Sequence, residues 1–267
     1  MDDLQRQKEL TKRLKLAAKA YYQEDREIMS NFEYDELYDE LAALEKKTGI
    51  VYAGSPTVQV GYEVLSELPK ERHETPMLSL DKTKDPEALA AWLKDREGLL
   101  SWKMDGLTIV LTYREGRLFK AVTRGNGEIG EVITNNAKVF RNIPLAISYP
   151  GEMTLRGEAV IRYSDFEAIN ARIENVDARY KNPRNLCSGT VRQLNNQITA
   201  ERDVNFFAFA LVSRKRPDGT EDTPFQTRLE QMNYLRSLGF ETVTERLVTK
   251  ENIEEEIHRF AGQVEKN

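Results

Sequence analysis

The apolar positions of the first 50 residues repeat with the spacing of an α-helix. Four of them lie three or four residues apart on one predicted face: Leu10, Leu14, Ala17 and Tyr21. Ser30 and Glu33 form a Ser-x-x-Glu capping box that predicts the start of a second helix, and Gly49 is well placed to end it. We therefore predict a helical hairpin over residues 1–50. It is too small to bury a good core alone and should dock on another part of the protein.

The pattern changes after this hairpin. Residues 51–82 contain five glycines and prolines, which interrupt long elements and predict a connector with short strands at most. From about residue 83 helices alternate with strands. The predicted strands are 99–113, 117–124, 153–161, 204–212 and 241–248. Five helices are predicted in this part. The first begins at Asp85-Pro86, and the second runs from a Ser164/Glu167 capping box to about Glu174. The others cover 184–195, Thr223-Pro224 to Gly239, and 250–265. With a hairpin turn at 114–116, this mixture favours an α+β fold with antiparallel sheets and flanking helices.

Composition limits the class of protein. The chain has 267 residues, 40% hydrophobic and 31% charged, which is typical of a globular protein with one moderate and one smaller domain. No apolar run approaches the roughly 18 residues of a spanning helix, and the N-terminus lacks signal-peptide features, so we expect no membrane partner and a cytoplasmic location. The single cysteine, Cys187, excludes an internal disulfide framework and a Cys-x-x-Cys zinc module. The net charge of −5 gives no general attraction for nucleic acid.

Lys103 opens the tetrapeptide Lys-Met-Asp-Gly, between the apolar runs 99–102 and 107–111. A lysine amine at a strand end can attack the α-phosphorus of a nucleotide and hold AMP covalently. Only about 0.04% of a free lysine is neutral at pH 7, so burial or nearby cations must lower its pKa. The alternative is a turn preceded by a solvated lysine, because Lys-x-Asp-Gly occurs by chance in roughly 3% of chains of this length.

Two later segments contain residues that could bind a nucleotide. In the turn 123–127, glycines would let backbone amides approach an anion while Arg124 grips it; the alternative is an exposed hairpin turn. Glu158 lies inside the apolar strand 153–161, where a carboxylate is costly unless it is paired or bound. It could hold a ribose hydroxyl or a metal-bound water; the alternative is an edge-strand charge that faces solvent.

Two arginines, Arg184 and Arg192, lie eight residues apart in the predicted helix 184–195. Eight residues rotate a helix by about 800°, or about 80° beyond two full turns, so both side chains can lean toward one site. The alternative is a pair of solvated helix arginines.

Taken in order, these segments resemble the N-terminal part of bacterial NAD-dependent DNA ligases over nearly the whole chain. The matching motifs are Tyr21-Tyr22, Asn31 to Asp35, Ser55-Pro56-Thr57, His73 to Leu80, Lys103 to Gly106, Thr123 to Gly127, Arg156-Gly157-Glu158, Asn182 to Asn185, and Arg192-Gln193. The resemblance implies a nicotinamide-mononucleotide recognition unit over 1–60. It also implies an adenylation domain of the nucleotidyltransferase class (ATP-grasp-like, DNA ligase type) over 61–267, truncated at its C-terminal end.

The resemblance also assigns roles to residues. Lys103 would attack the adenylyl phosphorus of NAD and release nicotinamide mononucleotide, with Mg²⁺ neutralising phosphate charge. The hairpin residues that would bind the nicotinamide half are Tyr21, Tyr22, Asn31, Tyr34 and Asp35. The residues that would bind the adenylyl half, its ribose, its phosphate or the metal are Ser79, Leu80, Ser101, Asp105, Gly106, Arg124, Glu158, Arg184, Arg192 and Phe209. Arg202 matches a position used on DNA, so nicked double-stranded DNA is the expected partner of the full-length protein.

Several departures from the family pattern predict a divergent member. Ser101, Asn126, Val132 and Asn31 stand where the family usually has acids. The chain stops at Asn267, before the family's further strand motifs and domains, so we expect a monomeric fragment that does not seal nicks alone. Two alternatives remain: an ATP- or GTP-using nucleotidyltransferase, which the tyrosine-rich hairpin disfavours, and an inactive ligase-like protein that only binds nucleotide or DNA.

Overall fold

The computed structural model describes residues 2–24, 28–58, 65, 67–77, 80–173 and 179–264, except for the side chains at 19, 21–24, 31, 263 and 264. Its helices and antiparallel sheets confirm the predicted α+β class. Among the described residues, no helix is both long and apolar enough to cross a membrane.

The chain begins with the predicted helical hairpin, formed by α1 (Asp3–Glu24) and α2 (Asn31–Thr48). Leu10 and Leu14 of α1 and Leu41 of α2 are fully buried against one another. The Ser30 hydroxyl accepts the Glu33 N–H at 3.2 Å, and Gly49 ends α2 with φ 69°. Both predicted helix boundaries are therefore confirmed, and the hairpin has a small apolar cluster of its own.

From β1 (Val51–Tyr52) onward, the chain forms what we call the sheet domain. Its centre is a six-stranded sheet in the order β1-β7-β5-β4-β8-β9 with antiparallel neighbours. Its other strands are β7 (Pro144–Ala146), β5 (Arg117–Thr123), β4 (Leu107–Arg114), β8 (Glu152–Val160) and β9 (Asn205–Lys215). Side chains alternate between the two faces of a strand, so Ile109, Leu111 and Tyr113 share one buried face of β4. Thr108 and its partner in register, Glu158, lie on the opposite face.

Helices cover the buried face of this sheet. The main core joins the sheet to α4 (Thr134–Ala137), α6 (Pro183–Val191) and α8 (Arg228–Ser237). Two further helices, α5 (Tyr163–Ala171) and α7 (Asn196–Glu201), lie on either side of α6 in the sequence. The core therefore occupies one face only, and the polar residues of the other face remain accessible to a ligand.

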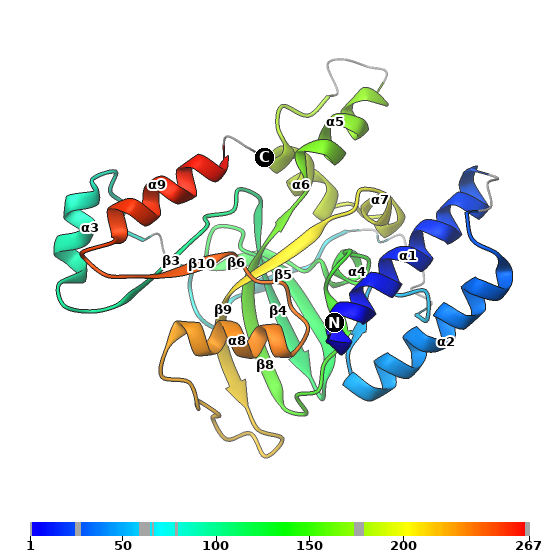
Figure 1. The fold of residues 1–267 in the computed structure, drawn as a ribbon, viewed down its shortest axis with the longest axis horizontal. Coiled ribbons are helices and arrows are strands. Elements are labelled where there is room, and N and C mark those ends of the chain that lie inside the picture. Colours follow the sequence, from blue (N-terminus) through cyan, green and yellow to red (C-terminus); the bar gives the residue numbers. More distant parts are fainter. Residues whose placement is uncertain are drawn as a thin grey trace.

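Two small antiparallel ribbons complete the sheet domain. In the first, β3 (Gly98–Ser101) pairs with β10 (Glu245–Val248) and packs on α3 (Pro86–Leu93) and α9 (Ile253–Val264). In the second, β2 (Lys70–Arg72) pairs with β6 (Ile129–Glu131). In Figure 1 the first ribbon and its helices lie on one side of the molecule and the α1–α2 hairpin on the other.

Helix boundaries in α5, α6 and α8 differ from the prediction. Arg162, not Ser164, is the N-cap of α5 and makes no side-chain cap, because the helix already begins at Tyr163; it also ends at Ala171, before Glu174. The helix expected from Thr223 begins only after Thr227, which forms a complete capping box with Glu230. The helix expected over 184–195 ends at Val191, and the chain starts α7 after Asn195. A Ser-x-x-Glu or Thr-Pro pattern marks a possible cap, and the packing of the following turn decides which one is used.

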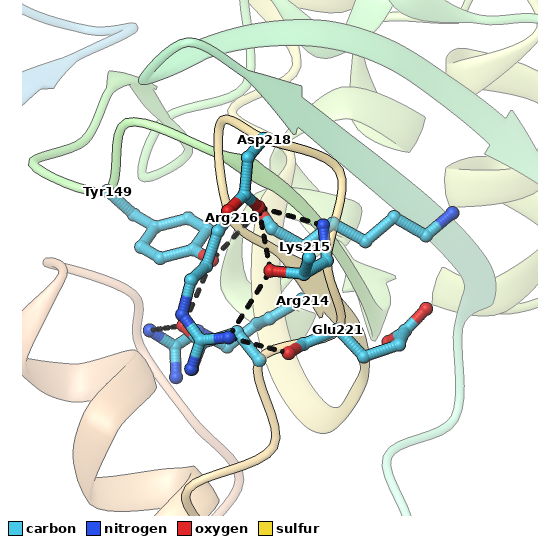
Figure 2. A network of polar contacts seen from close by, with 8 residues as sticks. Tyr149, Arg214, Lys215, Arg216, Asp218 and Glu221 are labelled. Atoms are coloured by element: carbon cyan, nitrogen blue, oxygen red, sulfur yellow. Dashed lines mark hydrogen bonds and ion pairs between the residues drawn. The ribbon is translucent and has the colours of Figure 1, made fainter.

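The far end of β9 contains a buried arginine with an unusual environment. Arg214 is only 8% exposed, and its guanidinium lies 4.4 Å from the ring centres of both Tyr149 and Tyr234. It forms an ion pair with Asp222 at 2.9 Å. Figure 2 shows Tyr149, Arg214 and Arg216 gathered beside the turn that follows β9. Contacts of a planar cation with aromatic faces stabilise such a cluster when it is shielded from water.

We predict that Arg214→Lys lowers the free energy of unfolding by about 1–2 kcal/mol, because an ammonium keeps the charge but loses the planar stacking on two rings. Arg216→Lys is the matched control, since Arg216 also contacts Asp222 but is exposed. It should change stability by less than about 0.5 kcal/mol. Urea unfolding of both variants measures the difference, and equal effects would contradict a special role for the buried arginine.

Candidate functional site

Lys103 lies in the segment that joins β3 to β4, as its position between two apolar runs predicted. Before it, the Trp102 N–H donates to the Thr244 carbonyl at 3.1 Å, and the Trp102 ring packs on Phe260 of α9 with ring centres 5.2 Å apart. After it, Gly106 packs against the end of β8. The backbone is therefore anchored on both sides of Lys103.

The Lys103 side chain itself is exposed. The structure therefore does not bury Lys103, and nearby cations remain the predicted influence on this amine. Its charge still acts on the site, because Lys103 and Arg184 both lie close enough to Glu158 to stabilise the ionised form of that carboxylate. The lysine, the arginine and the glutamate thus form one electrostatic group.

Gly106 is required by close packing. A Cβ atom at this position would lie 1.9 Å from the Ala159 carbonyl oxygen and 2.8 Å from a methyl carbon of Val160. Real non-bonded contacts are far longer, so any side chain would push the β3–β4 segment away from β8. The glycine of the tetrapeptide therefore brings Lys103 close to the strand that contains Glu158.

Glu158 lies on an interior strand of the sheet, which excludes the alternative of an edge-strand charge. Its carboxylate accepts the Gly106 N–H at 3.2 Å and the Thr108 hydroxyl at 2.8 Å. Burial raises the pKa of Glu158, and the two hydrogen bonds and the nearby charges of Lys103 and Arg184 partly oppose that rise. The carboxylate is thus positioned by two donors on the open face of the sheet.

Thr108 is a site residue that sequence reasoning missed. It holds Glu158 through the direct cross-strand pair of β4 and β8. The alternation of β4 places Thr108 on the polar face, so the period-two pattern contained a usable signal. No local sequence pattern predicts the contact of Phe260 with Trp102, because the two residues lie more than 150 positions apart in the chain.

Arg184, at the start of α6, reaches the tetrapeptide. Its guanidinium donates to Asp105 at 2.8 Å, although the two side chains are 59% and 72% exposed. An ion pair at this exposure contributes little stability. The contact matters for the geometry of the site rather than for stability. It brings Arg184, the predicted phosphate-binding arginine, and Asp105, the predicted acid, beside Lys103.

Arg192 behaves differently. It is the C-cap of α6, outside the helix, and its guanidinium pairs with Glu131 of β6 at 2.6 Å and with Ser188 at 2.9 Å. The predicted helix over 184–195 is therefore too long, because α6 ends at Val191, and the prediction that Arg184 and Arg192 lean toward one site stays a prediction. The two arginines pair with different carboxylates on different segments.

The glycine-rich turn after β5 is closed by its own hydrogen bonds. Asn126 accepts the N–H groups of Glu128 and Ile129 through its side chain, and the Gly127 N–H donates to the Arg124 carbonyl at 3.0 Å. These amides are not free for an anion, contrary to the prediction from the glycines. The Arg124 side chain is half-buried and donates to the Met77 carbonyl at 3.2 Å, which joins the turn to the segment before residue 78.

Two further predicted site residues are the aromatic Phe209 and the basic Arg202. Phe207, not Phe209, is the residue directly opposite Glu158, because a register shift in the β8–β9 pairing leaves Phe209 without a directly opposed residue. Arg202 ends α7, and its guanidinium donates to Thr190 at 3.0 Å. The roles of Phe209 in adenine binding and of Arg202 in DNA binding stay predictions.

The remaining predicted residues are spread more widely. Leu80 is 90% exposed, and Ser101 is exposed in β3 opposite Glu245. Tyr34 stacks on Tyr38 within the hairpin, and Asp35 is exposed. The predictions for Ser79 and for the side chains of Tyr21, Tyr22 and Asn31 lie outside the described residues. The hairpin lies on the opposite side of the molecule from β3, after which Lys103 follows (Figure 1).

No group of three or more acidic, histidine or cysteine side chains that could hold a metal ion occurs within the part of the chain that the structure describes. Asp105 and Glu158 are two carboxylates near Lys103. Mg²⁺ is commonly held by one or two carboxylates together with waters and substrate phosphates. The side chains therefore fit a metal that arrives with a phosphate better than a resident ion.

Comparisons with known proteins find two family models that match along the chain. Residues 65–267 match the NAD-dependent DNA ligase adenylation domain, and residues 1–61 match the DNA ligase-like N-terminal NAD+-binding domain. The chain is similar to the DNA ligase of Lachnoclostridium phytofermentans, with 67% identity over 97% of the chain and 39% of that protein. It is also similar to the DNA ligases of Ruminiclostridium cellulolyticum (59% identity, 100% of the chain, 40% of the relative) and Helicobacter pylori strain P12 (38%, 92% and 38%).

These matches define the class first: an NAD+-binding unit followed by an adenylation domain. The chain belongs to the NAD-dependent DNA ligase family. It spans about two fifths of the length of the curated relatives it matches.

We predict that replacing Glu158 changes how stability depends on pH. Burial raises the folded pKa of Glu158 above its ordinary value of 4.5, so the folded state holds this proton more tightly than the unfolded state. The resulting stability is fully present below the unfolded pKa and is lost as pH rises through the folded pKa. Glu158→Gln cannot titrate. Its free energy of unfolding should therefore rise relative to that of the native chain as pH increases above the ordinary carboxyl pKa of 4.5.

Urea unfolding at several pH values measures this difference. Glu167→Gln is the matched control, because it removes an exposed carboxylate from α5. A constant difference between Glu158→Gln and the native chain over the whole range would contradict the assigned environment of Glu158.

We predict that Gly106→Ala destabilises the fold by about 1–3 kcal/mol, because the new methyl group meets the Ala159 carbonyl and the strand segment has to shift. Gly262→Ala in α9 is the control, since no atom lies within 4 Å of a Cβ there. It should stabilise by about 0.4–1 kcal/mol through helix propensity and chain entropy. Thermal unfolding compares the two, and a neutral Gly106→Ala would refute the packing argument.

Proposed function

We propose that this chain is the NAD-binding and adenylation part of an NAD-dependent DNA ligase, and that Lys103 accepts AMP from NAD. The observation that carries the proposal is the grouping of Lys103 with Glu158 and with Arg184, itself paired to Asp105. A lysine beside an arginine and two carboxylates offers a nucleophile and a phosphate-binding cation, and the carboxylates can hold a ribose hydroxyl or a phosphate-bound metal. We propose a division at residue 60 between the NAD-binding unit, 1–60, and the adenylation domain, 61–267.

The proposed step is a phosphoryl-type displacement. The lone pair of the neutral Lys103 Nζ attacks the adenylyl phosphorus of NAD and forms a phosphorus–nitrogen bond. The bond from that phosphorus to the bridging oxygen breaks, and nicotinamide mononucleotide leaves with the electron pair. One of the two Nζ protons goes to water and the other stays on the nitrogen, so the products are lysine-AMP and nicotinamide mononucleotide. Arg184 and Arg124 would carry phosphate charge, and Arg192 would do so after release from Glu131.

The two carboxylates have different tasks in this proposal. Glu158 is already positioned by Gly106 and Thr108, which suits a group that accepts a hydrogen bond from a ribose hydroxyl. Asp105 is exposed and uses one oxygen on Arg184, so the other can face a ligand. Mg²⁺ would be held by Asp105 or Glu158 together with phosphate oxygens, and it would supply positive charge against the developing negative charge on phosphate.

The hairpin would bind the nicotinamide half of NAD through Tyr21, Tyr22, Asn31, Tyr34 and Asp35. Aromatic rings can stack on a nicotinamide ring, and an acid can accept from ribose hydroxyls. Since α1 and α2 lie on the opposite side of the molecule from β3, one NAD molecule could contact both sites only after the hairpin changes its position. The contacts that such a movement would break include the ion pairs Lys8–Glu241 and Lys15–Asp203, described below.

For the longer protein we propose nicked double-stranded DNA as substrate, with Arg202 on the DNA side, and action in replication and repair. We also propose that the chain works in the cytoplasm and that the part studied is a monomer. These proposals rest on the similarity to DNA ligases and on the predicted position of Arg202 beside α7.

The labelling prediction tests the nucleophile. NAD with a labelled adenylyl phosphate should tag the chain covalently, and Lys103→Ala should abolish the tag, because no other amine occupies this position. Lys138→Ala, which removes an exposed lysine at the end of α4, should leave the tag unchanged. Mass spectrometry then locates the AMP.

Unchanged labelling of Lys103→Ala would overturn the assigned nucleophile. Labelling by ATP but not by NAD would overturn the cofactor. No labelling of the native chain by either nucleotide would favour a ligase-like protein that binds without reacting.

A further inference from the structure

A second basic site lies between α1 and the sheet domain, away from Lys103. A cavity of about 260 Å³ separates α1 from the segments at residues 141 and 162, and we call it the α1 pocket. Three lysines of α1 face it, spaced four and three residues apart on one side of the helix: Lys8, Lys12 and Lys15. Arg141 and Arg162 line it from the sheet domain. Five cationic side chains from three segments therefore surround one cavity.

Two acidic side chains also line the α1 pocket, and both are already engaged. Asp203 pairs with Lys15 at 3.3 Å, and Glu241 lies 3.9 Å from Lys8. The side chains of Lys12, Arg141 and Arg162 have no ion-pair or hydrogen-bond partner within the described part of the chain. The pocket thus keeps three cations in excess.

The neutral polar groups of the pocket cannot balance this charge. The Asn142 amide exchanges hydrogen bonds with the backbone of Phe206, at 2.7 and 2.9 Å, and the Thr11 hydroxyl donates to the Gln7 carbonyl at 2.8 Å. Like charges that converge on one cavity repel each other, and the repulsion grows where water is partly excluded. An anion placed among Lys12, Arg141 and Arg162 would relieve it and accept charge-assisted hydrogen bonds.

The volume of the α1 pocket and the side chains that line it limit the kind of ligand that it can bind. The cavity is smaller than the roughly 300–1,000 Å³ of common ligand pockets, so it suits a small anion rather than a whole dinucleotide. Arginine and lysine together are typical phosphate-binding groups. The lining residues come from both the hairpin and the sheet domain, so a ligand here would bridge the two parts.

We propose that the α1 pocket binds a small phosphate-bearing anion of about the size of pyrophosphate, held by Lys12, Arg141 and Arg162. The bound anion joins α1 to the sheet domain. That junction otherwise includes the two lysine–carboxylate pairs Lys8–Glu241 and Lys15–Asp203. The site is independent of Lys103 and does not rest on the proposed ligase chemistry.

Isothermal titration of the chain with sodium pyrophosphate, without Mg²⁺ and at constant ionic strength, tests this proposal. Lys12→Gln and Arg162→Gln should each weaken binding about tenfold, since each removes a charged donor. The matched controls are Lys46→Gln, an exposed lysine of α2, and Arg172→Gln, at the other end of α5 from Arg162. Both should bind as the native chain does. Lys103→Ala should also bind normally, which separates this site from the nucleotide site.

Loss of binding in Lys103→Ala with normal binding in Lys12→Gln and Arg162→Gln would move the anion to the nucleotide site and overturn the proposal. Absence of any pyrophosphate binding by the native chain would overturn it as well. A short DNA duplex serves as competitor, because a backbone phosphate offers the same chemistry. If pyrophosphate still binds in the presence of the duplex, the ligand of the α1 pocket is a free anion. If the duplex displaces pyrophosphate, and this displacement is lost in Lys12→Gln and Arg162→Gln, the ligand is a DNA phosphate and the proposal of a free anion is overturned.

Discussion

The antiparallel pairing of β4 with β8 is the constraint on which the rest of the structure depends. One register places Ile109 opposite Gly157 and Thr108 opposite Glu158. Because side chains alternate along a strand, the first pair lies on the helix-covered face and the second lies on the open face. A shift of β8 by one residue would turn Glu158 toward the core, and a shift of β4 by one residue would instead expose its apolar residues. The core and the candidate site are therefore fixed by the same set of backbone hydrogen bonds.

Close packing at the end of this pair extends its effect to Lys103. The absence of a side chain at Gly106 lets the β3–β4 segment lie against Ala159, and its N–H then reaches Glu158. On the other side, Trp102 joins the segment to Thr244, directly before β10, and to Phe260 of α9. The backbone around Lys103 is held while its side chain stays exposed, which suits a nucleophile that has to meet a ligand from solution.

The hairpin is attached to the sheet domain in a different way from the elements of the main core. Its apolar cluster around Leu10, Leu14 and Leu41 is separate from the main core. Its contacts with the sheet domain include the pairs Lys8–Glu241 and Lys15–Asp203, both between partly exposed groups. Such pairs contribute little each and weaken with salt. Small charged ligands at this junction can therefore influence how firmly the hairpin is docked, whereas the core of the sheet domain is insensitive to them.

The sequence by itself determined the α+β class, the hairpin, the tetrapeptide at Lys103 and the family, because these follow from local periodicity, capping and ordered motifs. The sequence correctly predicted Ser30 as the N-cap and Gly49 as the C-cap of α2, because each of these residues stabilises the helix end at which it lies. It failed at Ser164, at Thr223 and at the end of α6, where neighbouring packing chose another boundary. Only the tertiary structure decided that Arg192 pairs with Glu131, that Thr108 positions Glu158 and that Phe260 supports Trp102. Each of these contacts joins segments far apart in the chain, and no local pattern encodes which distant side chain will arrive.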